Sequence, residues 1–325
     1  MKKLMRTLSL ALVLALMVTV LSVSAMADWT PDKPITIMNY VKAGGGMDIA
    51  TRKFAELASK YTDATIVVDN KTGAGGLVAA DYILQQPADG YLVFATTVSY
   101  VDTVLSQEED VENYIRGFEW IDDIMADPYC IIVKEDSDWT LESLIEDAQK
   151  EEQIWAGPAA GGSKHIAAIQ FCNALGAEIT WLPKDGGPDA MLAVLSDQAV
   201  ASCGNPGDVE GRELRHLVIA TKDKLAKYPD VPNFADLGYP ELDELSMWRG
   251  YAVKAGTPAE FIEWWQDLCE QITNDPEWVE FFNEKSIVVH NKTSEEFLDE
   301  LNADMAAHLE VLKAADLVDA DYTID

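Results

Sequence analysis

Strand-like and helix-like runs alternate along most of this chain, and this alternation constrains the fold more than any other feature. Between residues 35 and 97, apolar runs such as ITIMNYV, TIVVDN and YLVFATT are separated by segments with apolar residues at helical spacing. The same pattern resumes at PYCIIVKEDS and continues to LRHLVIAT. Strands that alternate with helices usually pair in parallel through helical crossovers. The pattern therefore predicts an α/β fold with two Rossmann-like units.

The remaining third of the chain is of a different kind. A segment dense in Pro, Gly and aromatic residues, KYPDVPNFADLGYPELDELSMWRGYAVKAGTP, follows the second unit. The tail is predicted to be helical, with Thr257 as the N-cap and Pro258 as the first residue of a helix. A chain of 325 residues exceeds the usual size of a single hydrophobic core, so we expect two lobes.

The first 27 residues have the three parts of a secretory signal peptide. Lys2, Lys3 and Arg6 give a basic start, LSLALVLALMVTVL is the apolar centre, and Ala25-Met26-Ala27 is a small-residue cleavage motif. A transmembrane anchor is the alternative, but DWTP ends the apolar run directly after the motif. We therefore expect an exported protein that is cleaved after Ala27.

The chain is strongly acidic, with 56 Asp and Glu against 24 Lys and Arg and a formal net charge of −32. Such a charge disfavours nucleic acid and anionic lipid as partners. The four cysteines and four histidines are scattered without metal-ligand spacing, so no metal site is expected. Each cysteine lies in an apolar run, which favours buried free thiols over a disulfide.

Three consecutive glycines, at positions 44 to 46, lie between the first strand-like run and a helix-like run. This order points the free N–H groups of a first helical turn at whatever lies over residues 43–48. Each N–H bond to a charged group contributes about 1.5 to 3 kcal/mol, so two or three can hold a carboxylate without Lys or Arg. Asp48 has two interpretations. It is an N-cap that accepts from residue 50 or 51, which we favour, or it contacts the ligand.

A second loop, Gly161-Gly162-Ser163-Lys164-His165, has the same order of strand, glycines and helix. Ser163 is predicted to be the N-cap of that helix. A nucleophilic pair of Ser163 and His165 is disfavoured because residues i and i+2 of a helix face different sides and no G-x-S-x-G motif is present. His165 is therefore a capping or lobe-contact residue, or a donor to the ligand.

The first loop also begins like a dinucleotide-binding fingerprint. However, Ile49 occupies the position of the third glycine, and the chain has no G-K-[ST] motif. We expect no cofactor and no catalysis. An exported dinucleotide-dependent oxidoreductase stays as an alternative.

Eight motifs, taken in order, resemble the solute receptors of tripartite tricarboxylate transporters, the TctC or Bug family. The resemblance covers nearly all of residues 31–290, although Tyr40, Val41, Lys42 and Ala88 depart from the common family pattern. The motifs are AGGGMD, DNKTGAGGLVAADYI, PADGYLV, GPAAGGSKHIAA, WLPKDGGPDAMLAVLSDQ, ASCGNPGDV, YPDVPNFADLGYP and WRGYAVKAGTP.

The resemblance implies a two-lobed periplasmic-binding-protein fold of the Venus flytrap, type II-like kind, with a cleft between the lobes. Residues 28–126 and 249–325 would form lobe I, and residues 127–248 lobe II. The expected function is that of a non-enzymatic periplasmic receptor, a monomer that delivers a small di- or tricarboxylate to TctA- and TctB-like membrane subunits. A sensory receptor for a signalling partner would share the same pocket and is the alternative.

The resemblance also implies two sets of ligand-binding residues, one in each lobe. Within these sets, Lys42 is either a solvated charge at the rim or the partner of a second carboxylate. The set in lobe I is Lys42, Ala43, Gly44, Gly45, Gly46, Met47, Asp48, Thr97 and Ser99, and the set in lobe II is Gly162, Ser163, His165, Asn205 and Asp208.

Overall fold

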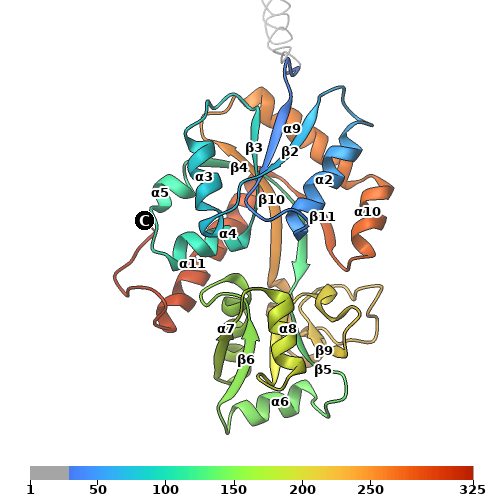
Figure 1. Cartoon of the computed structure of the whole chain (residues 1–325), viewed down its shortest axis with the longest axis vertical. Helices are drawn as coiled ribbons and strands as arrows, with labels where there is room; N and C mark the ends of the chain where they lie inside the picture. The colour runs from blue at the N-terminus through green and yellow to red at the C-terminus, as the bar shows by residue number, and fades with distance from the viewer. Residues whose placement is uncertain (1–28, 325) are drawn as a thin grey trace, which may run out of the picture.

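The computed structural model describes residues 29–324 and has two lobes, each built around its own β-sheet (Figure 1). The first sheet has six strands in the order β11-β4-β10-β3-β1-β2, and the second has five in the order β7-β6-β8-β5-β9. The predicted α/β class and the two-lobed arrangement are thus confirmed. The predicted signal peptide and its cleavage site lie outside the described residues.

The first lobe combines the beginning and the end of the chain. Its strands are β1 (Ile35–Asn39), β2 (Ile66–Asn70), β3 (Leu92–Thr97), β4 (Phe118–Pro128), β10 (Ser246–Lys254) and β11 (Val288–Lys292). Its helices are α2 (Gly46–Ala58), α3 (Leu77–Leu84), α4 (Val98–Ser106), α5 (Val111–Tyr114), α9 (Ala259–Thr273), α10 (Pro276–Asn283) and α11 (Ser294–Ala314), with the 3₁₀ turn η1 (Ala74–Gly76).

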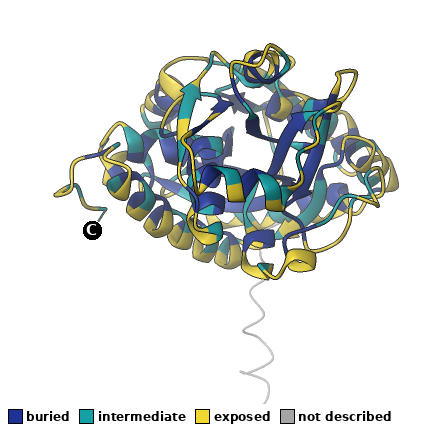
Figure 2. Cartoon of the chain, turned by 90° about the horizontal axis from the view of Figure 1, so that it is seen from below, coloured by how far each residue is buried: buried dark blue, intermediate teal, exposed yellow. Residues whose placement is uncertain are grey.

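Helices cover both faces of the first sheet. Apolar residues of α3, α4 and α11 pack on one face, and those of α2, α9 and α10 pack on the other. The helices bury one side only, so their outer sides stay exposed in Figure 2, while the central strands β1, β3, β4 and β10 are mostly buried. Because the helices pack on the sheet, the loops that join each strand to the next helix lie at the ends of the strands.

The second lobe is formed by the middle of the chain. Its strands are β5 (Cys130–Lys134), β6 (Gln153–Gly157), β7 (Ile179–Pro183), β8 (Ala201–Gly204) and β9 (Leu214–Ile219). Its helices are α6 (Leu141–Ala148), α7 (Ser163–Leu175) and α8 (Gly187–Leu195), with the 3₁₀ turns η2 (Pro206–Val209), η3 (Ala235–Leu237) and η4 (Pro240–Glu244). Helices α6 and α7 pack on one face of its sheet and α8 on the other.

The prediction of parallel pairing holds only in part. Strand β1 is parallel to β2 and β3, and β6 is parallel to β7 and β8. The strands that join the lobes are antiparallel instead: β10 pairs with β4 from Ser246 opposite Pro128 to Lys254 opposite Phe118. The chain leaves the first sheet at Pro128, enters the second at Cys130 and returns at Ser246. The predicted lobe boundaries, 126/127 and 248/249, stay predictions.

Several smaller expectations can be compared with the structure directly. The helix predicted to begin at Pro258 begins at Ala259, so Pro258 and not Thr257 is its N-cap. All four cysteines are buried and free, as predicted. Among residues 29–324, no helix combines the length and the apolar composition that crossing a membrane requires.

Asp275 connects the start of α10 to the end of α2. Its carboxylate accepts hydrogen bonds from Lys60 Nζ (2.9 Å), Tyr61 Oη (2.8 Å) and the backbone N–H of Glu277 (2.8 Å). The hydrogen bonds from Lys60 and Tyr61 lower the pKa of Asp275 to about 2. Because the folded-state pKa lies below the unfolded value of about 3.9, the ionised carboxylate stabilises the fold above pH ~4, and this contribution is lost as the pH falls toward 2.

We therefore expect Asp275→Asn to lower the free energy of unfolding at pH 7 by about 1 kcal/mol, since Asn keeps the N-cap but loses the charge. Urea titrations should show this difference shrinking as the pH falls from 4 toward 2. The control is Glu56→Gln, which removes an exposed carboxylate that pairs with Lys53 and should change stability by less than about 0.5 kcal/mol. A constant difference between Asp275→Asn and the wild type at every pH would contradict the role assigned to the charge.

Candidate functional site

The first glycine loop follows β1 and leads into α2, as predicted. The first intrahelical bond runs from the Ile49 N–H to the Gly45 carbonyl, 2.9 Å away, so the N–H groups of Gly46, Met47 and Asp48 precede it. Gly44 has a positive φ of 81°, a conformation that favours glycine and turns the chain into the helix. The loop therefore presents three backbone donors at the start of a 13-residue helix.

The expected N-cap role of Asp48 is wrong, because α2 begins two residues earlier, with Gly45 as its N-cap. The buried carboxylate of Asp48 instead accepts from the Gly44 N–H (2.8 Å), Arg52 Nε (3.0 Å) and Asn70 Nδ2 (2.9 Å). Burial opposes its ionisation, but these hydrogen bonds outweigh burial and lower its pKa. Asp48 thus holds the loop in place through the Gly44 N–H, and Arg52 neutralises its charge.

Lys42 and Ala43 are exposed at the outer side of this loop. Within the described residues, Lys42 has no carboxylate within ion-pair distance; its backbone carbonyl accepts from the Gly45 N–H at 3.0 Å. Both interpretations of its side chain stay open.

A buried arginine that the sequence analysis did not select lies against the same loop. Arg249 in β10 forms an ion pair with Asp127 in β4, and both side chains are buried. A Cβ atom built on Gly46 would lie 2.7 Å from Arg249 Nη2 and 2.8 Å from Cζ. Only glycine at position 46 leaves room for this guanidinium. The loop therefore has a buried positive charge beside it, which the sequence analysis did not predict.

Thr97 and Ser99 lie where β3 ends and α4 begins. Thr97 is the N-cap of α4: its Oγ1 accepts from the Ser99 N–H (3.2 Å) and shares a 2.6 Å hydrogen bond with Tyr40 Oη. Burial raises the pKa of Tyr40 to about 12, so its hydroxyl stays protonated at neutral pH. Thr97 is also paired with Arg249 in the sheet. The hydrogen bond to Tyr40, which directly follows β1, connects the end of β3 to the start of the glycine loop.

The two predicted sets of residues meet at one hydrogen bond. Ser99 Oγ in the first lobe lies 2.9 Å from Ser163 Oγ in the second, and Ser99 also donates to Met247 Sδ at 3.7 Å. Beside this contact, Ile166 of α7 packs into the apolar core of the first lobe with α4 and α11. The start of α7 is therefore seated against the first lobe.

The second glycine loop repeats the geometry of the first. The N-cap of α7 is Gly162, so the prediction that Ser163 is the N-cap is wrong by one residue. His165 Nδ1 accepts from the Gly161 N–H at 3.0 Å, and the ring stacks on Trp181 with centroids 4.6 Å apart. Burial lowers the pKa of His165 to about 4, so the imidazole is neutral and Nδ1 is free to accept. In this arrangement His165 orders its own loop.

Asn205 and Asp208 lie at the start and within the η2 turn that follows β8. The Asp208 carboxylate accepts from Lys164 Nζ and from the Asn205 N–H, both at 2.9 Å, and Asn205 Nδ2 donates to the Pro128 carbonyl at 3.0 Å. Burial opposes ionisation of Asp208, but the charge of Lys164 outweighs it and lowers the pKa. These residues tie the second loop to the strand that joins the lobes.

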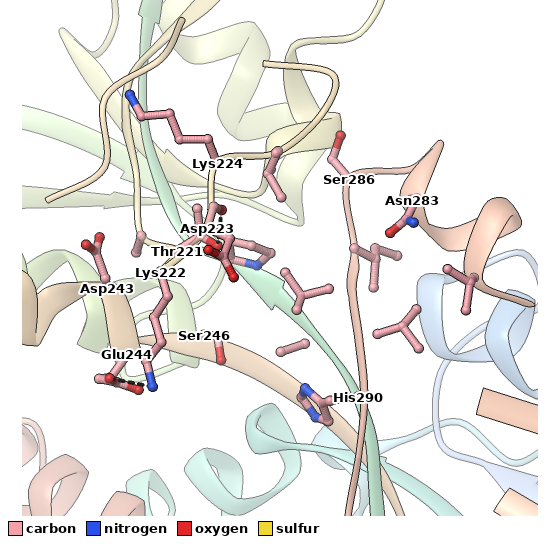
Figure 3. A pocket seen from close by; sticks show the side chains of 18 of the residues that line it. Thr221, Lys222, Asp223, Lys224, Asp243, Glu244, Ser246, Asn283, Ser286 and His290 are labelled. Atoms are coloured by element: carbon pink, nitrogen blue, oxygen red, sulfur yellow. Dashed lines mark hydrogen bonds and ion pairs between the residues drawn. The ribbon is translucent and has the colours of Figure 1, made fainter. Parts of the chain in front are cut away.

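A groove of about 730 Å³ opens on another side of the joining strands (Figure 3). Ala126 and Pro128 line it, whereas Asp127 between them points to the opposite face, as alternation along a strand requires. Residues 220–226 close it from the second lobe and α10 with β11 from the first. Its charged groups include the ion pair of Lys222 and Glu244, 2.8 Å long. None of the predicted ligand-binding residues lines this groove.

No group of three or more His, Cys, Asp or Glu side chains in residues 29–324 is arranged to hold a metal ion. The two loops offer backbone N–H groups and hydroxyls, with the Arg249 guanidinium beside the first loop and the Lys164–Asp208 ion pair at the second. Such groups bind anions and polar oxygens.

Comparison with solved structures shows that this chain has the fold of periplasmic solute-binding proteins. A TctC solute-binding protein from Polaromonas superposes with a TM-score of 0.75 at 22% identity, over 88% of this chain and all of that one. The R. palustris protein Rpa4515, solved with adipate, gives a TM-score of 0.73 at 21% identity, over 89% of this chain and 99% of that one.

The family follows from the sequence. Protein BugT of Bordetella pertussis is 28% identical over 248 residues, which are 73% of this chain and 75% of that protein. The model of the TctC family, described as the tripartite tricarboxylate transporter family receptor, matches residues 50–316. The chain belongs to this family, whose members are solute-binding receptors. The resemblance stated from the motifs is thereby confirmed.

The fit between Gly46 and Arg249 gives a first test of the site. Gly46→Ala must displace the guanidinium from its ion pair with Asp127, and we expect it to lower the free energy of unfolding by about 1 to 3 kcal/mol. Gly207→Ala is the control, because a Cβ there meets nothing within 4 Å; its effect should stay within about 0.5 kcal/mol. Urea unfolding of both variants checks this, and equal stability of the two would show that the guanidinium moves without cost.

A second test uses the neutral state of His165. Its unfolded pKa is about 6.5. Because its folded pKa is about 4, the unfolded chain binds a proton that the folded chain does not as the pH falls from 6.5 to 4. Stability should therefore fall in this window, by up to about 1.4 kcal/mol per pH unit from this group. The His165→Asn variant should lack this pH-dependent loss of stability. Its stability relative to the wild type should rise as the pH falls, and parallel curves from pH 7 to 4.5 would contradict the assignment.

Proposed function

We propose that this protein binds a small organic di- or tricarboxylate between its lobes and delivers it to TctA- and TctB-like membrane subunits. The observation that carries the proposal is that two helix starts of the same kind, one from each lobe, lie beside the contact between the lobes. The start of α2 in one lobe and the start of α7 in the other each offer free N–H groups after a glycine loop, and Ser99 and Ser163 bring the lobes together beside them. A ligand with two separated carboxylates suits such a pair.

The proposed mechanism is closure of the lobes around the ligand. Only the strands that connect the sheets need to bend, because each lobe has its own buried core. The contact of Ile166 and Ser163 with the first lobe would form in the closed state. A ligand that touches both loops binds this state more tightly than the open one and shifts the population toward it. No covalent step is required.

The ligand class can be tested with the exported chain, residues 28–325. Calorimetry and thermal unfolding should be measured with adipate, malate and citrate, and with adipamide as the uncharged control. We expect saturable binding of at least one carboxylate. At 100 times its Kd, such a ligand adds about 2.7 kcal/mol of stability, which raises Tm by several degrees in a protein of this size. Binding of adipamide alone, or of none of the four compounds, would overturn the carboxylate class.

Delivery to a transporter needs a separate measurement. Cells that lack this protein should take up less of the radiolabelled carboxylate that binds in vitro, and the intact gene should restore uptake. Unchanged uptake would favour the sensory role over the transport role while leaving the binding result intact.

A further inference from the structure

We infer that Arg249 is a ligand-binding residue, and that the first-lobe half of the site recognises a full negative charge through this guanidinium in addition to backbone N–H groups. This inference rests on the proposed function and deepens it, because it names a side chain that would recognise the negative charge of the proposed carboxylate. It assigns a role to a residue outside the two glycine loops. Its evidence is the position, burial and bonding of the Arg249 side chain.

Arg249 reaches the start of α2 from the middle of the sheet. It lies in β10 opposite Thr97, the last residue of β3, and its guanidinium lies against Gly46, the first residue of α2. The N–H groups of the first turn of α2 are therefore next to a fixed cation. An anion placed at this helix start would meet both the helix dipole and the arginine.

Two of the three nitrogen atoms of the guanidinium have no hydrogen-bond partner among the described residues. Arg249 is only 5% exposed, yet its Nε and Nη1 atoms have no hydrogen-bond partner among the described residues, and only Nη2 is bonded, to Asp127. Buried donors of a charged group without an acceptor are strongly unfavourable, which is why nearly all are satisfied in folded proteins. Nε and Nη1 lie on different edges of the guanidinium, so each can donate a charge-assisted hydrogen bond to an anionic oxygen.

The charges around Arg249 leave the site able to accept an anion. The Asp48 carboxylate, which is also at the start of α2, is bonded to Arg52 on the other side of the loop. Tyr40 stays neutral. Among residues 29–324, Asp127 is the acidic residue that forms an ion pair with Arg249, so the pair has no net charge. The free N–H groups of the helix start add partial positive charge. Asp127 is then a positioning residue, and it also opposes an incoming anion.

This arrangement predicts opposite effects of two substitutions. Asp127→Asn keeps a hydrogen-bonding group beside Arg249 but removes the negative charge, so it should tighten carboxylate binding. The double variant Asp127→Asn/Arg249→Gln removes both charges together and leaves no unpaired buried charge to disturb folding. It should weaken binding by about ten- to a hundredfold, the range expected for lost hydrogen bonds to a charged group. Arg116→Gln, an exposed arginine paired with Glu112, is the matched control and should bind like the wild type.

The experiment is calorimetry with adipate, malate and citrate on the wild type and these three variants, at low and at high salt, with circular dichroism to confirm folding. Tighter binding by Asp127→Asn, together with weaker and less salt-dependent binding by the double variant, supports the inference. Equal affinities of the wild type and the folded double variant would overturn it, and Arg249 would then be structural, with its donors satisfied by water. If the wild type binds none of the three acids, the proposed function fails first, so the two failures are distinguishable.

Discussion

The pairing of β4 with β10 is the constraint on which the rest of the structure depends. These two strands lie side by side inside the first sheet over the whole length of β10, and the end of β4 continues directly into the second sheet. The second lobe is therefore attached to the first through the ends of paired strands, and these ends are the segments that bend in the proposed closure. The same pairing brings Asp127 and Arg249 together from distant parts of the chain. The same two strands, β4 and β10, thus connect the lobes and carry the charged residues of the candidate site.

Each lobe contributes a glycine loop of the same local structure to the candidate site. A buried strand ends, glycines turn the chain, and a helix begins with its N–H groups unpaired. In both loops a side chain four residues ahead accepts from a loop amide: Asp48 from Gly44, and His165 from Gly161. These bonds hold the glycines in place, so the free donors of the helix start are oriented before any ligand arrives. Rigid donors lose little entropy on binding, which favours affinity for a small ligand.

Much of this arrangement could be predicted from the sequence because its signals are local. Alternating runs fixed the class of fold, and glycines between a strand and a helix located both loops. The errors at Asp48 and Ser163 arose because glycine can itself be an N-cap, so a polar residue nearby does not mark the first turn. Arg249 could not be found in this way. Its partners, Gly46 and Asp127, are far from it in sequence, and only the antiparallel insertion of β10 between β3 and β4 brings them together. The signal in the sequence was a charged residue in the middle of a strand whose immediate neighbours are mostly apolar.

The placement of the four cysteines has a consequence for how this protein can be followed in solution. Cys130, Cys172 and Cys203 are buried in the second lobe, and Cys269 is buried in the first. Burial raises the pKa of each thiol, so none is a reactive thiolate while its lobe is intact. A thiol reagent then reacts only after local unfolding. The two lobes therefore carry natural and separate chemical labels, which can distinguish the loosening of one core from the loosening of the other without any engineered probe.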